Sequence, residues 1–243
     1  MKLNNKVYIY KFEEKYISYK VRWINASENN RFLHYDLPLE YEQTKNWFEK
    51  NKENKKRYDA VIDYNGEPIG LIGLLDIDLK NKKAEYYITI GEAKYRGKGI
   101  AEKATYELLN YAFNELALKR IYLYTEKENY SAQHLFEKVG FKKEGLLTGD
   151  LIYQGREIDR FVYGITYSEY AKTDLLNETP IHKLGLSVNG NHIFVKRDDL
   201  LPFSFGGNKV RKACLFFNEI IKQKADIVVT YGSSASNHCR IIA

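Results

Sequence analysis

The part of this chain that most constrains its fold is the six-residue turn from Arg96 to Ala101, with the letters RGKGIA. It follows an apolar stretch, Ala84 to Ile90, that predicts a strand, and it opens an amphipathic stretch, Ile100 to Leu118, that predicts a helix. The glycines leave backbone N–H groups uncovered, and a helix start adds unbonded donors and the positive end of a dipole. This order of elements predicts a pyrophosphate site.

The letters of the turn exclude two common phosphate-binding motifs. A P-loop requires G-x-x-x-x-G-K-[ST], and no such string occurs in the chain. A dinucleotide fingerprint requires a third glycine where Glu102 stands. The spacing Arg96-x-x-Gly99-x-Ala101 instead resembles the [QR]-x-x-G-x-[GA] loop of the GNAT acyltransferases, which hold acetyl-CoA.

A second motif extends the resemblance. Residues 121–125 predict a strand rich in β-forming residues, and 131–139 predict a short helix that Gly140 closes. The run from Asn129 to Phe141 resembles the second GNAT motif, N-x-x-A-x-x-L-[YF]-x-K-x-G-F. Two motifs in this order identify residues 1–167 as similar to a GNAT domain.

The resemblance implies an α/β fold with a mixed, mostly antiparallel sheet flanked by helices. The chain begins with a predicted strand, 7–12, and two helices near 16–24 and 41–50. A hairpin follows across Asn65-Gly66, and a second hairpin closes the domain near Gly164. We expect residues 1–167 to form the GNAT domain, 168–178 a linker, and 179–243 a second segment.

The second segment resembles the N-terminal end of the fold-type II pyridoxal-phosphate enzymes, in the aminocyclopropane-carboxylate deaminase and D-cysteine desulfhydrase group. The motifs are V-K-R-D-D-L at 195–200, G-G-N-K-x-R-K at 206–212 and S-N-H at 236–238. The resemblance implies a Schiff-base lysine, a catalytic serine and a contact to the cofactor ring hydroxyl, at Lys209, Ser236 and Asn237 respectively.

Activity of this second segment is not expected. Such enzymes supply a glycine-rich phosphate loop and a partner for the pyridine nitrogen later in the chain, and neither occurs before Ala243. We therefore expect an incomplete parallel α/β fragment that does not bind pyridoxal phosphate. A pyridoxal-phosphate-dependent amino-acid deaminase or desulfhydrase is the alternative function if the missing part exists.

The composition, 44% hydrophobic and 29% charged, is ordinary for a soluble globular protein. The net charge of +6 suits a phosphate-rich ligand, and no aromatic-basic motif indicates nucleic acid. Cys214 and Cys239 are too few for a disulfide scaffold, and no signal peptide or apolar membrane span is visible. We expect a cytoplasmic protein without a metal site, and the sequence indicates no oligomeric state.

The family resemblance also implies which residues hold acetyl-CoA. The turn would donate N–H groups to the pyrophosphate, and strand residues would pair with the pantetheine amides. From the residues alone, the strand could equally be part of the core, and Asn129 could equally cap the following helix. The expected cofactor contacts are Ile88, Ile90, Arg96, Gly97, Lys98, Gly99, Ala101 and Asn129.

Acyl transfer to an amine also requires a base, because an amine with a pKa of about 10 must lose a proton before it attacks. Glu85 is the acid nearest to the expected reaction centre, and Asp76 is a second candidate. An ion pair of Glu85 with Lys82 or Lys83 is the structural alternative.

The acid that protonates the leaving thiolate is harder to assign. Many GNAT enzymes carry a tyrosine where Phe136 stands, and phenylalanine has no proton to give. Tyr130 and Ser131 lie near in sequence and are the candidates, together with water. A non-catalytic acyl-CoA-binding module is a further alternative that Phe136 leaves open.

Two short patterns bear on which amine accepts the acetyl group. W-I-N-x-x-x-N-N-R at 23–31 and G-x-x-x-D-R-x-x-Y-G at 155–164 resemble a branch that contains nucleotide-sugar amine, ribosomal-protein and polyamine acetyltransferases. Because the chain is basic, we expect a small-molecule amine, a 4-amino-sugar nucleotide, as the acceptor. Acetylation of a protein N-terminus or of a polyamine is the alternative.

Overall fold

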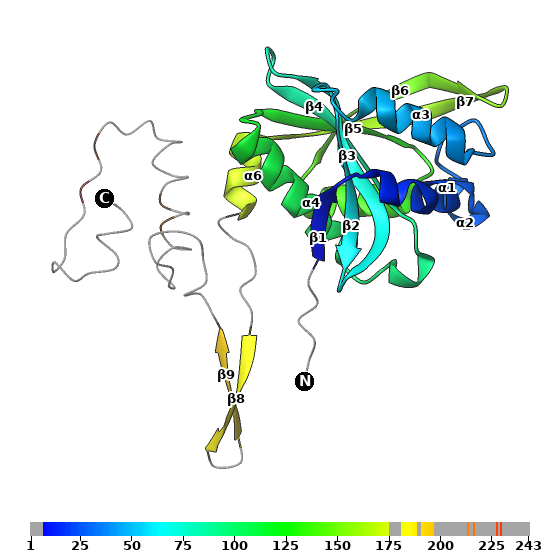
Figure 1. The fold of residues 1–243 in the computed structure, drawn as a ribbon. Helices are drawn as coiled ribbons and strands as arrows, with labels where there is room; N and C mark the ends of the chain where they lie inside the picture. Colours follow the sequence, from blue (N-terminus) through cyan, green and yellow to red (C-terminus); the bar gives the residue numbers. More distant parts are fainter. Residues whose placement is uncertain are drawn as a thin grey trace. The chain divides into compact units, whose positions relative to one another are not determined.

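The computed structural model describes residues 7–174, 181–188 and 191–196, together with the isolated positions 213, 216, 227 and 229. The chain divides into two compact units, Met1–Tyr167 and Ser168–Ala243. The first unit is a mixed α/β domain in which helices flank a seven-stranded sheet (Figure 1). The predicted fold class is therefore confirmed for this unit.

The sheet has the strand order β1-β2-β3-β4-β5-β7-β6. Neighbouring strands are antiparallel except for the parallel pair β4 and β5. The strands are β1 (Val7–Lys11), β2 (Tyr58–Tyr64), β3 (Glu67–Asp78), β4 (Lys83–Ile90), β5 (Arg120–Glu126), β6 (Lys142–Tyr153) and β7 (Arg156–Thr166).

The two parallel strands pair over a short distance only. Lys83 to Glu85 of β4 pair with Arg120 to Tyr122 of β5, and the register continues no further. β4 pairs with β3 along its other edge up to Ile90. Beyond Glu85 and Tyr122 the strands separate, and we call this region the β4–β5 fork.

Six α-helices and one π-helical turn are present among the described residues. They are α1 (Ile17–Asn25), α2 (Ser27–Asn30), α3 (Tyr41–Asn51), α4 (Ile100–Asn110), the π-helical turn (Tyr111–Glu115), α5 (Tyr130–Val139) and α6 (Tyr167–Asp174). The four-residue helix α2 has no apolar period that could have predicted it. The single helix expected over 100–118 instead changes to π geometry at Tyr111.

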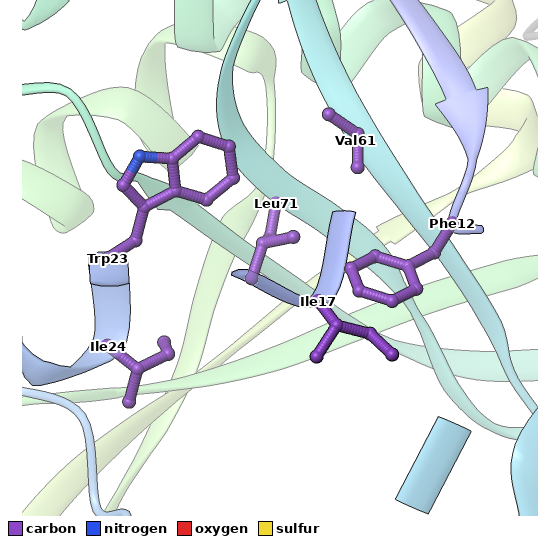
Figure 2. Packing of buried hydrophobic residues seen from close by; sticks show 6 residues of the cluster. All are labelled: Phe12, Ile17, Trp23, Ile24, Val61 and Leu71. Atoms are coloured by element: carbon purple, nitrogen blue, oxygen red, sulfur yellow. The ribbon is translucent and has the colours of Figure 1, made fainter. Parts of the chain in front are cut away.

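The core on one face of the sheet lies beneath α1 and α3. Phe12, Ile17, Trp23 and Ile24 pack against side chains of β2 and β3 in one buried cluster (Figure 2). In α1 the buried positions recur every three to four residues, as an amphipathic helix requires. We call this side of the sheet the α1 face.

The opposite side of the sheet, the α4 face, has its own aromatic core. Tyr86 of β4 donates to or accepts from Thr105 of α4 at 2.8 Å, and its ring lies 5.9 Å from that of Phe136 in α5. Side chains alternate between the faces along β4. Glu85 and Tyr87 therefore lie on the α1 face, whereas Tyr86 lies on the α4 face.

Among the described residues of the second unit, β8 (Ile181–Val188) and β9 (Asn191–Lys196) form an antiparallel pair. These two strands are therefore not parallel to each other, contrary to the arrangement expected for this segment, and the strand expected at 226–230 lies mostly outside the described residues. A two-residue connection, Asn189-Gly190, is typical of a hairpin, whereas a parallel crossover needs about a dozen residues. Lys209, Ser236 and Asn237 lie outside the described residues, so their predicted roles stay predictions.

Candidate active site

The 96–101 loop joins β4 to α4 through two glycines in the left-handed region. Gly97 has φ 71° and Gly99 has φ 72°. A methyl group at Gly97 would meet no atom within 4 Å, and one at Gly99 would meet only Glu102 Oε2 at 3.9 Å. Any residue other than glycine would therefore have a strained backbone at both positions. Without side chains there, the backbone is open to a ligand.

The N–H groups of residues 97 to 102 donate to no acceptor among the described residues. The first helical hydrogen bond of α4 runs from the Lys103 N–H to the Gly99 carbonyl at 3.2 Å. Glu102, the acidic side chain of the first turn, is paired with Lys138 at 2.6 Å, which offsets its negative charge. Uncovered donors at a helix start fit a diphosphate.

The side chain of Arg96 is bound within the protein. Its guanidinium donates to the carbonyl of Glu28 at 3.1 Å, to the carbonyl of Ile90 at 3.2 Å and to Oδ1 of Asn29. These acceptors belong to α2 and to the end of β4. The predicted contact of Arg96 with the cofactor stays a prediction, and its side chain already joins the loop to α2.

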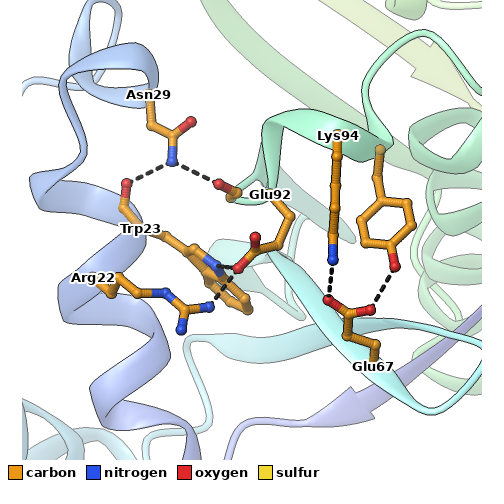
Figure 3. Close-up of polar contacts among 8 residues, drawn as sticks. Arg22, Trp23, Asn29, Glu67, Glu92 and Lys94 are labelled. Atoms are coloured by element: carbon orange, nitrogen blue, oxygen red, sulfur yellow. Dashed lines mark hydrogen bonds and ion pairs between the residues drawn. The ribbon is translucent and has the colours of Figure 1, made fainter.

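The segment that leads into the loop is bonded to α1 and α2 (Figure 3). Asn29 Nδ2 donates to the carbonyls of Trp23 and Gly91, each at 2.8 Å. Glu92 Oε1 accepts from Trp23 Nε1 at 2.8 Å and from the guanidinium of Arg22. The start of β3 holds the same segment from its other end, since Glu67 accepts from Lys94 at 2.8 Å and from the Tyr95 hydroxyl at 2.5 Å.

The free edge of β4 offers peptide groups to a ligand in the β4–β5 fork. The Gly91 N–H donates to the Ile69 carbonyl in β3 at 2.8 Å. Peptide groups alternate in direction along an antiparallel strand, so those of Ile88 and Ile90 point away from β3 toward the fork. This direction is the one that the predicted pairing with pantetheine needs, although the Ile90 carbonyl already accepts from Arg96.

Glu85 lies at the point where the fork begins, opposite Tyr122. Burial raises the pKa of its carboxyl, the charge of Asp76 raises it further, and Arg160 acts in the opposite direction. Among the described residues, the carboxylates of Glu85 and Asp76 form no hydrogen bond and no ion pair, so the alternative pairing of Glu85 with a turn lysine is absent. A half-buried carboxylate with a raised pKa is suited to accept a proton.

Further polar groups lie near the fork. The sequence did not single out His34, and Arg160 entered only as a letter of the 155–164 pattern. His34, in the loop after α2, lies 2.8 Å from the Glu126 carboxylate at the end of β5. Its ring contacts that of Tyr153 with a centroid distance of 5.2 Å. Arg160 of β7 donates through Nε to Asp150 of β6 at 2.6 Å. The positive charge of Arg160 is therefore already matched.

The start of α5 carries the remaining predicted site residues. Asn129 caps the helix by accepting from the Ala132 N–H at 3.2 Å, which is the structural alternative to lining the cofactor arm. Tyr130 is 75% exposed, and Ser131 is also exposed. Phe136 is buried against the aromatic side chains of the α4 face. A catalytic acid at Tyr130 or Ser131 stays a prediction.

Comparisons with known proteins agree with this geometry. The Acetyltransferase (GNAT) domain family matches residues 7–142. The spermidine N(1)-acetyltransferase of Escherichia coli (strain K12) is 30% identical over 140 residues, which cover 56% of this chain and 75% of that protein. A crystal structure of spermidine N-acetyltransferase from Vibrio cholerae, in complex with CoA and spermine, superposes with a TM-score of 0.64 at 26% identity, covering 68% of this chain and 98% of the other.

The second unit has a separate resemblance. A bifunctional D-cysteine desulfhydrase/1-aminocyclopropane-1-carboxylate deaminase of Arabidopsis thaliana is 45% identical over 67 residues. This match covers 27% of the chain and only 17% of that enzyme. The resemblance is thus confined to a short segment and gives no support for pyridoxal phosphate in the acetyltransferase domain.

The expected acceptor requires a correction. A 4-amino-sugar nucleotide is wrong as the favoured amine, because the matched relatives are named for acetylation of spermidine. In the described part of the chain every helix is too short or too polar to span a bilayer. The matched family and the fold together show that this chain belongs to the GNAT acetyltransferases, as an acetyl-CoA-dependent N-acetyltransferase.

Proposed function

We propose that the first unit transfers the acetyl group of acetyl-CoA to a primary amine of a polyamine such as spermidine. The observation that carries this proposal is the pair of carboxylates, Glu85 and Asp76, at the start of the β4–β5 fork. Among the described residues neither carboxylate forms an ion pair, and Arg160, whose charge acts on Glu85, is itself paired with Asp150, so both can attract an ammonium group. The names of the matched relatives support the same acceptor.

Acetyl-CoA would lie along the strand-loop-helix already described. The uncovered N–H groups of residues 97 to 102 would donate to its pyrophosphate, with Lys98 as an exposed cation beside them. The peptide groups of Ile88 and Ile90 would extend the β4 edge to the pantetheine amides. This placement directs the thioester toward the start of the fork, where Glu85 lies.

Glu85 would act as the base, directly or through a water molecule. It takes the proton of the ammonium group, and the free amine then attacks the acetyl carbon. The new N–C bond forms as the C–S bond breaks, and the thiolate of CoA takes up a proton. Asp76 would hold the cationic acceptor and keep the pKa of Glu85 raised.

The experiment is a thiol-release assay with acetyl-CoA and a panel of amines. The panel contains spermidine, spermine, putrescine, a 4-amino-sugar nucleotide and a peptide with a free N-terminus. We expect the highest kcat/KM with a polyamine. Release of thiol only with the sugar nucleotide or the peptide refutes the acceptor, and tight CoA binding without thiol release indicates a binding module.

Variants of the same assay separate the roles. Asp76→Asn raises KM for spermidine, whereas Glu42→Gln, an exposed acid on α3, leaves it unchanged. Combined replacement Tyr130→Phe and Ser131→Ala tests the two candidate acids. Loss of kcat in the combined variant assigns the thiolate proton to one of them, and an unchanged kcat leaves water as its source.

A further inference from the structure

Asn29 is the one side chain of α2 that is buried, with 9% of its surface exposed. Its amide joins three segments of the chain. Nδ2 donates to the Trp23 carbonyl of α1 and to the Gly91 carbonyl after β4, each at 2.8 Å. Oδ1 accepts from the Arg96 guanidinium. Both amide hydrogens and the carbonyl oxygen are therefore engaged.

These bonds hold both ends of the segment that precedes the glycines of the 96–101 loop. Gly91 lies at one end, and a side chain there would come within 2.2 Å of the Trp23 ring. Arg96 lies at the other end, next to Gly97. Because Asn29 hydrogen-bonds to both Gly91 and Arg96, the position of α2 determines where the 96–101 loop starts and in which direction its N–H groups point.

The guanidinium of Arg96 also fixes the start of the 96–101 loop relative to α2. It donates to two backbone carbonyls, those of Glu28 and Ile90, in addition to Asn29. The planar guanidinium joins these three acceptors in a way that a lysine ammonium on a flexible stem does not reproduce. Its charge is therefore used within the protein, between α2 and the end of β4.

We propose that Asn29 is a positioning residue for acetyl-CoA, and that Arg96 acts through it and not as a ligand of the phosphates. Asn29 lies outside the 96–101 loop and the 129–141 motif, although it is one of the residues of the 23–31 pattern. It fixes the entry of the loop so that the N–H groups of residues 97 to 102 converge on the pyrophosphate. The inference rests on the proposed placement of the cofactor.

The test compares acetyl-CoA with S-acetylpantetheine, a donor that lacks the pyrophosphate. Asn29→Ala raises KM for acetyl-CoA about 10- to 100-fold, the range that follows from losing a hydrogen bond to a charged group. The same variant leaves kcat/KM for S-acetylpantetheine within about threefold of wild type. Asn30→Ala, the adjacent half-buried asparagine, is the matched control and changes neither value.

A second variant keeps the inference testable if Asn29→Ala does not fold. Arg96 is exposed, and Arg96→Lys keeps the charge but not the three-acceptor geometry. We expect Arg96→Lys to raise KM for acetyl-CoA as much as Arg96→Ala does. Near wild-type affinity in Arg96→Lys overturns the inference, because a phosphate ligand needs only the charge.

Two further outcomes also decide the matter. An equal loss of kcat/KM with both donors in Asn29→Ala overturns the positioning role, because the damage is then general. Wild-type protein that uses both donors with the same KM overturns the placement of the pyrophosphate, and this inference with it. Failure of spermidine as an acceptor affects neither comparison, since any accepted amine can report on the donor.

Discussion

Lys20 provides a quantitative test of the packing on the α1 face. Its side chain lies among the buried residues of α1 with 7% of its surface exposed. Nζ is 3.2 Å from the Trp47 ring centroid and 5.9 Å from that of Phe12. Burial lowers the pKa of Lys20 from 10.5 to about 7, the charge of Asp59 opposes this, and Arg57 adds to it.

This shift makes the stability of the protein depend on pH. Between pH 7 and pH 9 the unfolded chain keeps the Lys20 proton whereas the folded protein releases it, so the free energy of unfolding rises with pH. Each pH unit is worth about 1.36 kcal/mol, so Lys20 contributes a rise of about 2–3 kcal/mol over this window. Lys20→Met lacks this contribution and is therefore most stabilised, relative to wild type, at the acidic end.

The assay is urea unfolding at several pH values, followed by tryptophan fluorescence. Both tryptophans of the chain, Trp23 and Trp47, lie in the first unit. Lys50→Met, an exposed lysine of α3, is the control and should show no such pH dependence. A constant difference between Lys20→Met and wild type refutes the reasoning, and means that the π face of Trp47 keeps Lys20 charged throughout.

The remaining predictions concern the acetyl-transfer site. Gly91→Ala forces a methyl group against the Trp23 ring and lowers the free energy of unfolding by about 1–3 kcal/mol, so an unchanged thermal melt contradicts the contact. Glu85→Gln lowers kcat about 10²–10⁴-fold with little change in KM for acetyl-CoA, and retained turnover removes Glu85 as the base. Asp76→Asn removes a charge that raises the pKa of Glu85, so the acidic limb of the kcat/KM profile moves to lower pH; a limb that stays in place excludes the coupling. Gly99→Ala costs about 1–2 kcal/mol in the left-handed region and weakens acetyl-CoA binding measured by calorimetry, and equal affinity argues against the loop.

Elements with local signals could be predicted from the sequence. Asn65-Gly66 indicated the β2–β3 turn, and both residues have positive φ, 55° and 88°. Gly140 indicated the end of α5 and has φ 106°. The change to π geometry at Tyr111 leaves the apolar period almost unaltered, so no local pattern revealed it.

The site depended on contacts that sequence spacing does not encode. Arg96 bonds to Asn29 across 67 positions, and His34 meets Glu126 across 92. The prediction of a 4-amino-sugar nucleotide as the acceptor was wrong for a related reason. The net charge of +6 averages over the whole surface, whereas an incoming amine meets the local field of Glu85 and Asp76.

The short pairing of β4 with β5 has a consequence for amide hydrogen exchange in the sheet. Among the described residues, the β4–β5 ladder that joins the β1–β4 half of the sheet to the β5–β7–β6 half has only three residue pairs. The amides of the last β4 residues that point away from β3 have no neighbouring strand to protect them, so their hydrogens should exchange quickly with solvent. A ligand that hydrogen-bonds along this edge of β4 takes the place of a neighbouring strand and slows the exchange. Its binding also raises the free energy of unfolding of the domain.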